Sequence, residues 1–337
     1  MNDIKKLIEK CLIENPCEAD IRYNEPMSEH TTFKTGGAAD CWLRPDGEGF
    51  TSFCAALLNR ARSSGIPVFV LGGGANVVVS DKGIRGIVLD MGRWTGESVW
   101  ALCAGEDEFI IKSGTTIDEA VDYAAAEGLS GLEFLAGMPG TVGGAVWMNA
   151  RCYGGEMSDV LNWVEVIIND NTQLNGAQRK DESDSLDSFD FSIKRIYVND
   201  KSGFGYKKSP FQDMDCVILS ASFNLKKGDK EKILVEMDKY REDRYNKGHY
   251  SFPCAGSVFK NNHVFGKPSG QIIDELGLKG SKRGAAQVAP FHGNIIINLG
   301  GAKAGDIKGL ADEIAAKVKK ETGFVMEPEI LFIGEWD

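Results

Sequence analysis

Apolar side chains at the start of the chain recur every three or four residues, which is the spacing of one helix face. This spacing predicts an amphipathic helix over 4–12, formed by Ile4, Leu7, Ile8, Cys11 and Leu12. The same pattern over 50–61 predicts a second helix, which Gly65 ends. Short apolar runs at 67–71 and 87–89 predict strands, and a glycine run follows the first of them. Helix, strand, glycine turn and strand in this order indicate an α/β fold.

The rest of the chain continues this mixture of helices and strands. Apolar spacing predicts helices over 117–127, 270–276 and 306–321, and strands over 164–168, 217–225, 294–298 and 329–333. The acidic stretch 176–190 indicates a solvated loop. Near Lys226 the composition changes, and a strongly charged helix begins with an apolar face of Ile233, Leu234, Met237 and Tyr240. We therefore predict a domain boundary near 228.

Composition and charge exclude several classes of protein. The 337 residues carry a formal net charge of −11, which argues against a nucleic-acid binder because phosphate contacts need a basic surface. No apolar run approaches the roughly 18 residues that a membrane-spanning helix needs. Acidic residues interrupt the N-terminus, which therefore does not resemble a signal peptide. The 8 scattered cysteines indicate reduced thiols in a cytoplasmic protein, and the 4 histidines lack the spacing of metal ligands.

Two glycine-rich segments are the first candidates for ligand binding. Leu71-Gly-Gly-Gly-Ala-Asn76 follows a predicted strand, and its glycines let successive backbone N–H groups turn toward one anion such as a pyrophosphate. This segment matches neither the dinucleotide fingerprint nor the P-loop, and a structural turn explains it equally well. Gly137-Met-Pro-Gly-Thr-Val-Gly-Gly-Ala145 leads to Asn149 and has more glycines than one turn requires. Together they favour an extended ligand with phosphates in its middle over a close crossing of chain segments.

Two other segments place polar side chains beside turns. Ala255-Gly-Ser-Val-Phe-Lys-Asn261 contains Ser257, but no G-x-S-x-G elbow is present, so hydrolase chemistry is not indicated. A structural turn is the preferred interpretation of this segment taken alone. Glu327-Pro-Glu329 opens the last predicted strand. Alternation puts both carboxylates on one face of an extended segment, so that one of them can face a cleft.

Together and in order, these segments resemble the UDP-N-acetylenolpyruvoylglucosamine reductase (MurB) family of bacterial cell-wall synthesis. The resemblance begins at His30-Thr-Thr-Phe-Lys-Thr-Gly-Gly37 and includes the two glycine-rich segments and Ser80-Asp81 between them. It continues through Tyr153-Gly-Gly-Glu156, Phe204-Gly-Tyr206, the segment around Ser257, His292-Gly-Asn294 and Glu327-Pro-Glu-Ile330. It covers about residues 24 to 334, nearly the whole chain.

The resemblance implies an α/β (α+β) fold: a vanillyl-alcohol-oxidase-type (PCMH-type) FAD-binding domain of two α/β subdomains, and a C-terminal α/β substrate domain. We therefore expect a helical arm over 1–29, an FAD-binding domain over 30–228 that divides near 100, and a substrate domain over 229–337. The implied reaction uses non-covalent FAD, with NADPH as hydride donor, to reduce the enolpyruvyl ether of UDP-N-acetylglucosamine to UDP-N-acetylmuramate. The partner is then a small nucleotide sugar, without nucleic acid or membrane insertion, and the protein a monomer or weak homo-oligomer.

The resemblance also implies roles for individual residues. Ser257 would donate the proton to C2, and Glu329 would lie near the substrate carboxylate, with Glu327 as the alternative. The implied cofactor contacts are Gly72, Gly73, Gly74, Ala75, Asn76, Gly137, Met138, Pro139, Gly140, Thr141, Gly143, Gly144, Ala145 and Asn149. The implied substrate contacts are Tyr206, Lys247, Lys260, Asn261 and His292.

One departure from the family pattern follows Tyr206, where the family usually has arginine. Lys207 is the positional match, and it keeps the positive charge but lacks the planar bidentate grip of a guanidinium. Lys208 is the alternative. The stretch between Ser209 and Arg244 is too short for the tyrosine-bearing insertion of one subgroup, so the chain resembles the other subgroup.

Two other functions remain open at this stage. The first is a flavin-dependent oxidase on the same fold, of which many attach the flavin through a histidine or cysteine near the first glycine segment. No such residue lies between Cys54 and Cys103, which argues against that attachment. The second is a nucleotide-sugar-binding protein without chemistry, against which Ser257, Glu329 and both glycine segments argue.

Overall fold

The computed structural model describes the chain except residues 93, 95–98, 104–105, 170–171, 173–177, 180–190, 199–200 and 337. The predicted helices are confirmed, with ends shifted by a few residues. They are α1 (Asn2–Glu14), α2 (Phe50–Ser63), α3 (Ile117–Ala126), α5 (Lys230–Asn246), α6 (Ser269–Glu275) and α7 (Ala304–Thr322). A short α4 (Val142–Trp147) lies in the second glycine-rich segment. The predicted acidic loop 176–190 lies outside the described residues, apart from two residues of a strand.

The strands form two large sheets. The first is antiparallel and runs in the order β12 (Gln178–Arg179), β13 (Phe191–Tyr197), β11 (Leu161–Asn169), β14 (Cys216–Phe223), β7 (Glu106–Lys112) and β6 (Val99–Cys103). The second runs in the order β1 (Glu18–Pro26), β2 (Ala38–Asp46), β5 (Ile84–Asp90) and β3 (Val68–Leu71), with β3 parallel to β5. The strands predicted at 67–71, 87–89, 164–168 and 217–225 are therefore confirmed as β3, β5, β11 and β14.

Smaller pairings complete the described strands. An antiparallel sheet joins β16 (Lys282–Arg283), β17 (Ala286–Val288) and β18 (Ile296–Asn298). Three pairs are β4 (Val77–Val79) with β19 (Leu331–Ile333), β9 (Arg151–Cys152) with β10 (Gly155–Glu156), and β8 (Leu129–Ser130) with β15 (Lys226–Lys227). Strands β18 and β19 confirm the predictions at 294–298 and 329–333.

The chain divides into two compact units, and it passes between them several times. Unit 1 contains Met1–Arg22, Cys41–Gly73 and Gly86–Arg241. Unit 2 contains Tyr23–Asp40, Gly74–Arg85 and Glu242–Asp337. The long strands β1, β2 and β5 are thus counted partly in each unit. The boundaries expected at 29 and 228 would divide the chain into continuous domains, whereas each compact unit contains three separate segments. These boundaries stay a prediction.

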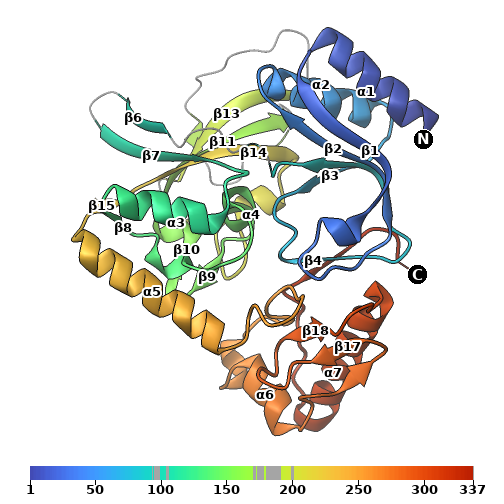
Figure 1. Ribbon diagram of the computed structural model, residues 1–337, viewed down its shortest axis with the longest axis vertical. Coiled ribbons are helices and arrows are strands. Elements are labelled where there is room, and N and C mark those ends of the chain that lie inside the picture. The colour runs from blue at the N-terminus through green and yellow to red at the C-terminus, as the bar shows by residue number, and fades with distance from the viewer. Residues whose placement is uncertain are drawn as a thin grey trace. The chain divides into compact units, whose positions relative to one another are not determined.

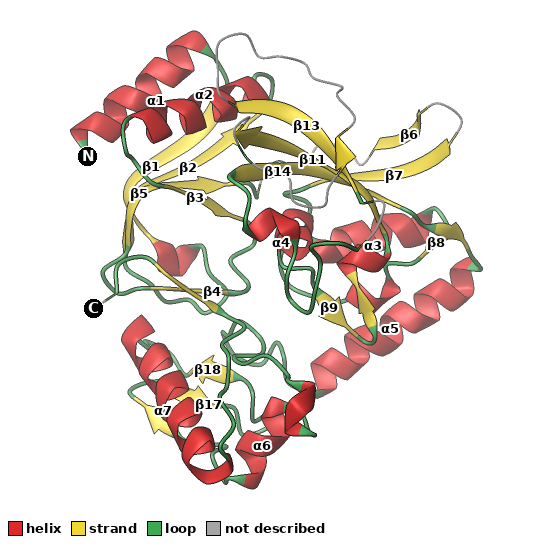
Figure 2. Ribbon diagram, turned by 180° about the vertical axis from the view of Figure 1, so that it is seen from behind, coloured by secondary structure: helices red, strands yellow, loops and turns green. Residues whose placement is uncertain are grey.

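The core of unit 1 lies on both faces of the six-stranded sheet. Helices α3 and α4 cover one face, where β11 and β14 contribute Val164, Val166, Ala221 and Phe223. Helix α2 packs on β11 and β13, and α1 lies beside α2 (Figures 1 and 2). Trp163 is almost fully buried. Burying such large apolar side chains supplies about 1.5–3 kcal/mol each, which fixes the sheet that carries the loops described below.

Helix α5 differs from its predicted amphipathic face. Ile233 and Met237 are buried against the core of unit 1, but Leu234 is 41% exposed. A helix turns about 100° per residue, so Leu234 is displaced from the stripe that Ile233 and Met237 share. The buried stripe is therefore narrower than the sequence pattern suggested.

Unit 2 combines the C-terminal residues with two segments from the first quarter of the chain. Helix α7 packs on β16 and β17, and β4 pairs in parallel with β19. Asp81 accepts the backbone N–H groups of Ala304 and Gly305, each at 2.9 Å. A carboxylate at this end of α7 satisfies N–H groups that have no partner in the helix and faces its positive dipole end. Ser80-Asp81 therefore holds the longest C-terminal helix.

Candidate active site

The unit 1 part of the first glycine-rich segment, which ends at Gly73, lies against the second segment. A Cβ added at Gly72 would lie 2.6 Å from Thr141 Oγ1, and one at Gly73 would lie 2.7 Å from the Cα of Gly140. Both distances are too short for any side chain, so glycine is required where the backbones meet. Gly73, Pro139 and Gly144 are nevertheless exposed beside this contact. The two segments form one continuous backbone surface that a ligand can reach.

Two hydrogen bonds hold the second glycine-rich segment in place, and an unpaired hydroxyl lies beside it. Gly143 donates its N–H to the Ser113 carbonyl at 2.8 Å, directly after β7. Thr141 caps α4 by accepting the N–H of Gly144 at 3.5 Å. The Ser113 hydroxyl is buried and has no hydrogen-bond partner within the described residues. Because a buried hydroxyl without a partner is costly, this atom indicates a place for a polar ligand atom.

Gly137 is anchored from outside the segment by Asp118 of α3. The carboxylate oxygen Oδ1 of Asp118 accepts the Gly137 N–H at 2.9 Å. The same oxygen accepts two N–H groups of Arg241 in α5, at 2.6 and 3.1 Å. Arg241 also donates to Asp122 at 2.8 Å. Charge-assisted bonds of this kind are the strong ones, so Asp118 joins α5 to the start of the glycine-rich segment.

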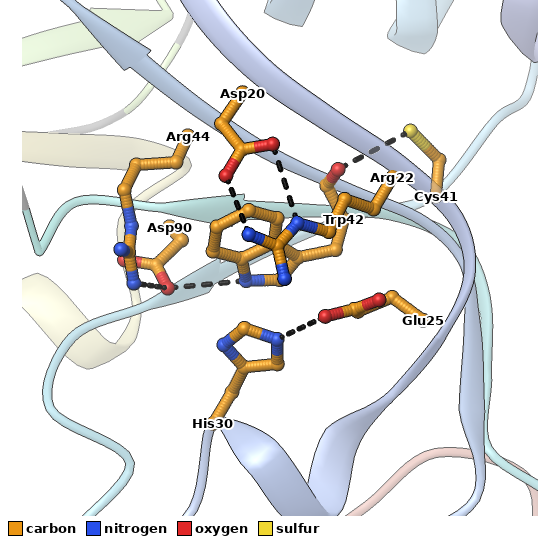
Figure 3. A network of polar contacts seen from close by, with 8 residues as sticks. All are labelled: Asp20, Arg22, Glu25, His30, Cys41, Trp42, Arg44 and Asp90. Carbon is orange, nitrogen blue, oxygen red and sulfur yellow. Dashed lines mark hydrogen bonds and ion pairs between the residues drawn. The ribbon is translucent and has the colours of Figure 1, made fainter.

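The strand before the first glycine-rich segment is fixed by a buried carboxylate. Asp90 is the register partner of Leu71, the last residue of β3. It accepts Trp42 Nε1 at 3.1 Å and Arg44 Nη2 at 2.9 Å (Figure 3). It also accepts the Gly92 N–H at 2.7 Å. A buried carboxylate with three donors is satisfied, so it stabilises this end of the sheet.

The last three residues of the first segment belong to unit 2. Gly74 has a φ of +63°, and a Cβ there would lie 2.1 Å from the His30 carbonyl oxygen, so glycine is required. Asn76 donates its side-chain amide to the Glu329 carbonyl at 3.1 Å and accepts the Leu331 N–H at 2.9 Å. Asn76, a predicted cofactor contact, thus also fixes the residues before β19, among them the predicted carboxylate Glu329.

Asn149 holds the turn in unit 1 that carries Lys207. Gly205 and Lys208 exchange backbone hydrogen bonds at 2.9 and 3.0 Å, which closes a turn with Tyr206 and Lys207 at its tip. Asn149 is fully buried; it donates to the Gly205 carbonyl at 2.9 Å and accepts the Ser158 N–H at 3.0 Å. Its side chain thus holds the lysine turn, which gives it a structural role beside the implied cofactor contact.

Backbone strain is concentrated around this turn. Asn149, Tyr153 and Lys207 have φ values of +44°, +48° and +56°. They are three of the five non-glycine residues with positive φ in the described chain. Such conformations cost of order 1–3 kcal/mol each and gather at functional sites. The position of Lys207 is therefore one that the fold maintains at a cost.

The structure separates the two candidate lysines of this turn. The Lys207 side chain is half-buried, and its Nζ lies 3.5 Å from the Arg151 carbonyl oxygen. Lys208 is exposed and lies 3.6 Å from Asp213, which is itself exposed. Lys207 therefore lies beside the segment that follows α4, while Lys208 is engaged on the surface.

Ser257 lines a cavity of about 310 Å³ in unit 2. Asn261, Asp274, Lys279, His292 and Asn294 line it too. Ser257 pairs with Ile295, and the next residue, Val258, donates to the Asn294 carbonyl at 2.8 Å. The Asn294 side chain accepts the Phe259 N–H at 3.0 Å and donates to the Phe259 carbonyl at 2.7 Å. The segment that contains Ser257 is thus fixed by a buried asparagine.

The two carboxylates near the C-terminus have different surroundings. Glu329 is half-buried, and its N–H donates to the Val258 carbonyl at 2.7 Å. Glu327 has a side chain 70% exposed, and its Oε1 lies 2.5 Å from Lys260 Nζ. Glu327 therefore neutralises the charge of Lys260. Glu329 is instead bonded through its backbone to Val258, the residue after Ser257. Alternation could not separate these two carboxylates, but burial and pairing do.

The histidines near the cavity are held neutral. Burial and the charges of Lys247 and Lys279 lower the pKa of His292. Its Nδ1 accepts the Asn294 N–H at 3.1 Å, so the proton of the neutral ring is on Nε2. Burial, with Arg244, His292 and Lys247 nearby, lowers the pKa of His249 to about 4. An uncharged imidazole N–H is thus available in the cavity at neutral pH.

Some cavity residues were missed by sequence reasoning, and some predicted ones are engaged elsewhere. Lys279 lies 2.6 Å from Asp274 and lines the cavity. The only signal for it was a lysine just after a helix, between turn glycines. The side-chain oxygen of Asn261 accepts the Ser269 N–H at 2.9 Å, and Lys247 Nζ lies 2.7 Å from Asp243. Both predicted substrate contacts therefore already have protein partners.

The described residues contain neither a metal site nor a membrane-spanning helix. No group of His, Cys, Asp or Glu side chains is arranged to hold a metal ion. No helix in that part of the chain is both long and apolar enough to cross a membrane.

Comparisons with known proteins cover nearly the whole chain. Residues 248–333 match the family model for the C-terminal domain of UDP-N-acetylenolpyruvoylglucosamine reductase, and residues 52–176 match an FAD binding domain. The reductase of Treponema denticola is 37% identical and covers 95% of each chain. That of Borreliella burgdorferi is 38% identical over 91% of this chain and 93% of its own. The crystal structure of the Thermus caldophilus enzyme superposes with a TM-score of 0.70 at 30% identity, covering 94% of this chain and 100% of its own.

Proposed function

Because the chain belongs to the UDP-N-acetylenolpyruvoylglucosamine reductase (MurB) family, we propose that Ser257, Glu329 and Lys207 carry the protein's part of this reaction. The chain is an FAD-containing oxidoreductase of peptidoglycan synthesis that reduces the enolpyruvyl ether of UDP-N-acetylglucosamine with NADPH. Its substrate is a small nucleotide sugar. We further propose a cytoplasmic protein, a monomer or weak homo-oligomer, that binds no nucleic acid.

The residues of the two glycine-rich segments suit FAD. Gly72 and Gly73 let the two segments meet, Gly73 and Gly144 are exposed beside that contact, and the buried Ser113 hydroxyl lacks a partner in the described residues. FAD held there would supply the hydride for C3 of the enolpyruvyl ether, with NADPH as the hydride donor. We assign the pyrophosphate and ribityl chain to residues 72–76 and 137–145, whose N–H groups suit an anion.

Ser257 supplies the proton that completes the reduction. Hydride addition at C3 leaves negative charge on C2 and the adjoining carboxylate, and protonation of C2 gives the product. Ser257 faces a cavity in unit 2 and is held by the pairing of Val258 with Asn294. A serine hydroxyl is a weak acid, so its role requires a fixed position and surroundings that stabilise its deprotonated form.

Glu329 and Lys207 act on the substrate carboxylate. The observation that carries the proposal for Glu329 is its backbone bond to Val258, the residue that follows Ser257. A second carboxylate repels the substrate, so Glu329 acts protonated or through a bound water. Lys207 contributes the positive charge that stabilises the developing anion. The implied contacts of Tyr206, Lys247, Lys260, Asn261 and His292 with the nucleotide sugar remain part of this proposal.

The purified protein tests the function directly. We expect a yellow protein whose FAD is released by acid, and whose visible absorbance is bleached by NADPH without oxygen. The enolpyruvyl nucleotide sugar should then restore the colour in a single turnover. Rapid reoxidation by oxygen alone, with no response to the nucleotide sugar, would indicate an oxidase. A colourless protein that FAD does not reconstitute would refute the proposal.

A further inference from the structure

Arg151 lies against the turn that carries Lys207, and two separate contacts hold it there. Its guanidinium carbon lies 5.7 Å from the centre of the Tyr206 ring. Its carbonyl oxygen lies 3.5 Å from Lys207 Nζ. Tyr206 and Lys207 are neighbours at the tip of the turn closed by Gly205 and Lys208. The guanidinium of Arg151 thus lies by Tyr206, and the ammonium of the next residue, Lys207, lies by the backbone of Arg151.

The fold maintains this arrangement against its local preferences. Lys207 adopts a φ of +56°, which glycine tolerates and lysine does not favour. The turn is fastened to the Arg151 side by Asn149, which donates to Gly205 at 2.9 Å. Stacking a cation on the Tyr206 ring orients the guanidinium while leaving its N–H edge exposed.

The charges around this turn favour an anion. Arg151 lies beyond ion-pair distance of every carboxylate in the described part of the chain. The nearby carboxylates Glu156 and Asp159 are both within ion-pair distance of Lys201, and the charge of Arg151 contributes to lowering the pKa of Asp159. An anion that reaches both Arg151 and Lys207 is attracted by two cations.

We propose that Arg151 is the second cation of the carboxylate site, and that it binds the enolpyruvyl carboxylate together with Lys207. This inference rests on the role proposed above for Lys207. The planar guanidinium provides two parallel N–H donors for the carboxylate, while the ammonium provides a point charge. Charge grows on this carboxylate as hydride adds at C3, so both cations bind the transition state more tightly than the substrate.

A double-mutant cycle on the FAD-loaded enzyme tests the inference. Arg151→Ala should slow reoxidation of the reduced flavin by substrate about 10- to 100-fold, and reduction by NADPH should stay within about 2-fold. It should also weaken substrate binding to the oxidised enzyme, measured from the flavin absorbance change. Arg151→Lys should retain part of both. Adding Arg151→Ala to Lys207→Ala should cost much less than it costs alone, because the two cations share one anion.

Lys208→Ala is the matched control, since it removes the same charge from the same turn at a residue close to Asp213. If Lys207→Ala leaves reoxidation unchanged, the proposed role of Lys207 is wrong and the inference falls with it. If Lys207→Ala slows reoxidation while Arg151→Ala behaves like Lys208→Ala, only the inference about Arg151 is overturned. Losses that multiply independently in the double variant would also overturn it.

Discussion

The side-chain amide of Asn149 donates a hydrogen bond of 2.9 Å to the carbonyl oxygen of Gly205, which lies 56 residues further along the chain. This bond joins the end of the second glycine-rich segment to the turn that carries Lys207. Its effect on the reaction can therefore be tested apart from the effect of the cofactor.

We expect Asn149→Gly to damage the lysine turn and spare the cofactor. Glycine tolerates the positive φ at this position, so only the side-chain bonds to Gly205 and Ser158 are lost. The buried Ser158 N–H is left without its partner, at about 1–3 kcal/mol, while the Gly205 carbonyl keeps the N–H of Lys208. Thermal unfolding should shift down and reoxidation by substrate should slow, with FAD content unchanged.

Asn24→Gly is the control for this substitution, because Asn24 also has a positive φ of +56° and is exposed. It should leave both stability and turnover close to native. If Asn149→Gly instead yields a stable protein that has lost FAD, the side chain serves the cofactor and not the turn.

Asp118 should matter for FAD retention, and Asp122 should not. Both carboxylates contact Arg241, but only Asp118 also accepts the Gly137 N–H. We expect Asp118→Asn to raise the dissociation constant of FAD about 10-fold, which corresponds to roughly 1.4 kcal/mol. Fluorescence titration of the apoprotein measures this. Equal losses from Asp118→Asn and Asp122→Asn would show that the contact with Arg241, and not the anchoring of Gly137, is what matters.

Glu329→Gln should impair turnover, whereas Glu327→Gln should not. Glu327 is exposed and neutralises Lys260, so removing its charge changes a surface pair worth at most about 1 kcal/mol. Glu329 is half-buried, and its N–H donates to the carbonyl of Val258, which follows Ser257. We expect Glu329→Gln to slow reoxidation by substrate at least about 10-fold without affecting reduction by NADPH. The proposed assignment is reversed if Glu327→Gln produces this pattern and Glu329→Gln does not.

Acid should destabilise unit 2 through His249. Burial lowers the pKa of this histidine from 6.5 to about 4, so the folded state binds its proton less readily than the unfolded state. The stability gained from the neutral ring is therefore complete above about pH 6.5 and is lost as the pH falls toward 4. Denaturant unfolding at several pH values should show a shallower decline for His249→Gln over this range. An identical decline in both proteins would contradict the assignment.

The sequence predicted the local elements well because their signals are local. Helices α1, α2 and α7 follow from apolar spacing within a few residues, and the glycines Gly65 and Gly323 mark the ends of α2 and α7. The prediction that Leu234 lies on the buried face of α5 was wrong, because apolar spacing alone does not show where the core lies. The glycine segments were recognisable, but their contact through Gly73 and Gly140 joins residues far apart in the chain.

The positioning residues could not be predicted for the same reason. Asp81 caps α7 across 223 residues, and Asn149 reaches Gly205 across 56. Glu327 and Glu329 are equivalent in alternation, and only burial and the pairing with Lys260 separate them. Arg151 carries no sequence signal at all, because its meaning comes from the turn against which it packs.

The central claim is that Ser257 donates the proton to C2, and rapid mixing of the Ser257→Ala variant tests it most directly. Alanine fits beside Gly256, so a serine that only shapes the turn can be replaced without consequence. The account predicts that NADPH still bleaches the flavin at nearly the native rate. It also predicts that reoxidation by the enolpyruvyl nucleotide sugar slows about 100-fold or more, with substrate affinity little changed. Ser257→Cys should retain more activity than Ser257→Ala, because a thiol can still donate. A Ser257→Ala variant that substrate reoxidises as fast as the native enzyme would contradict the account.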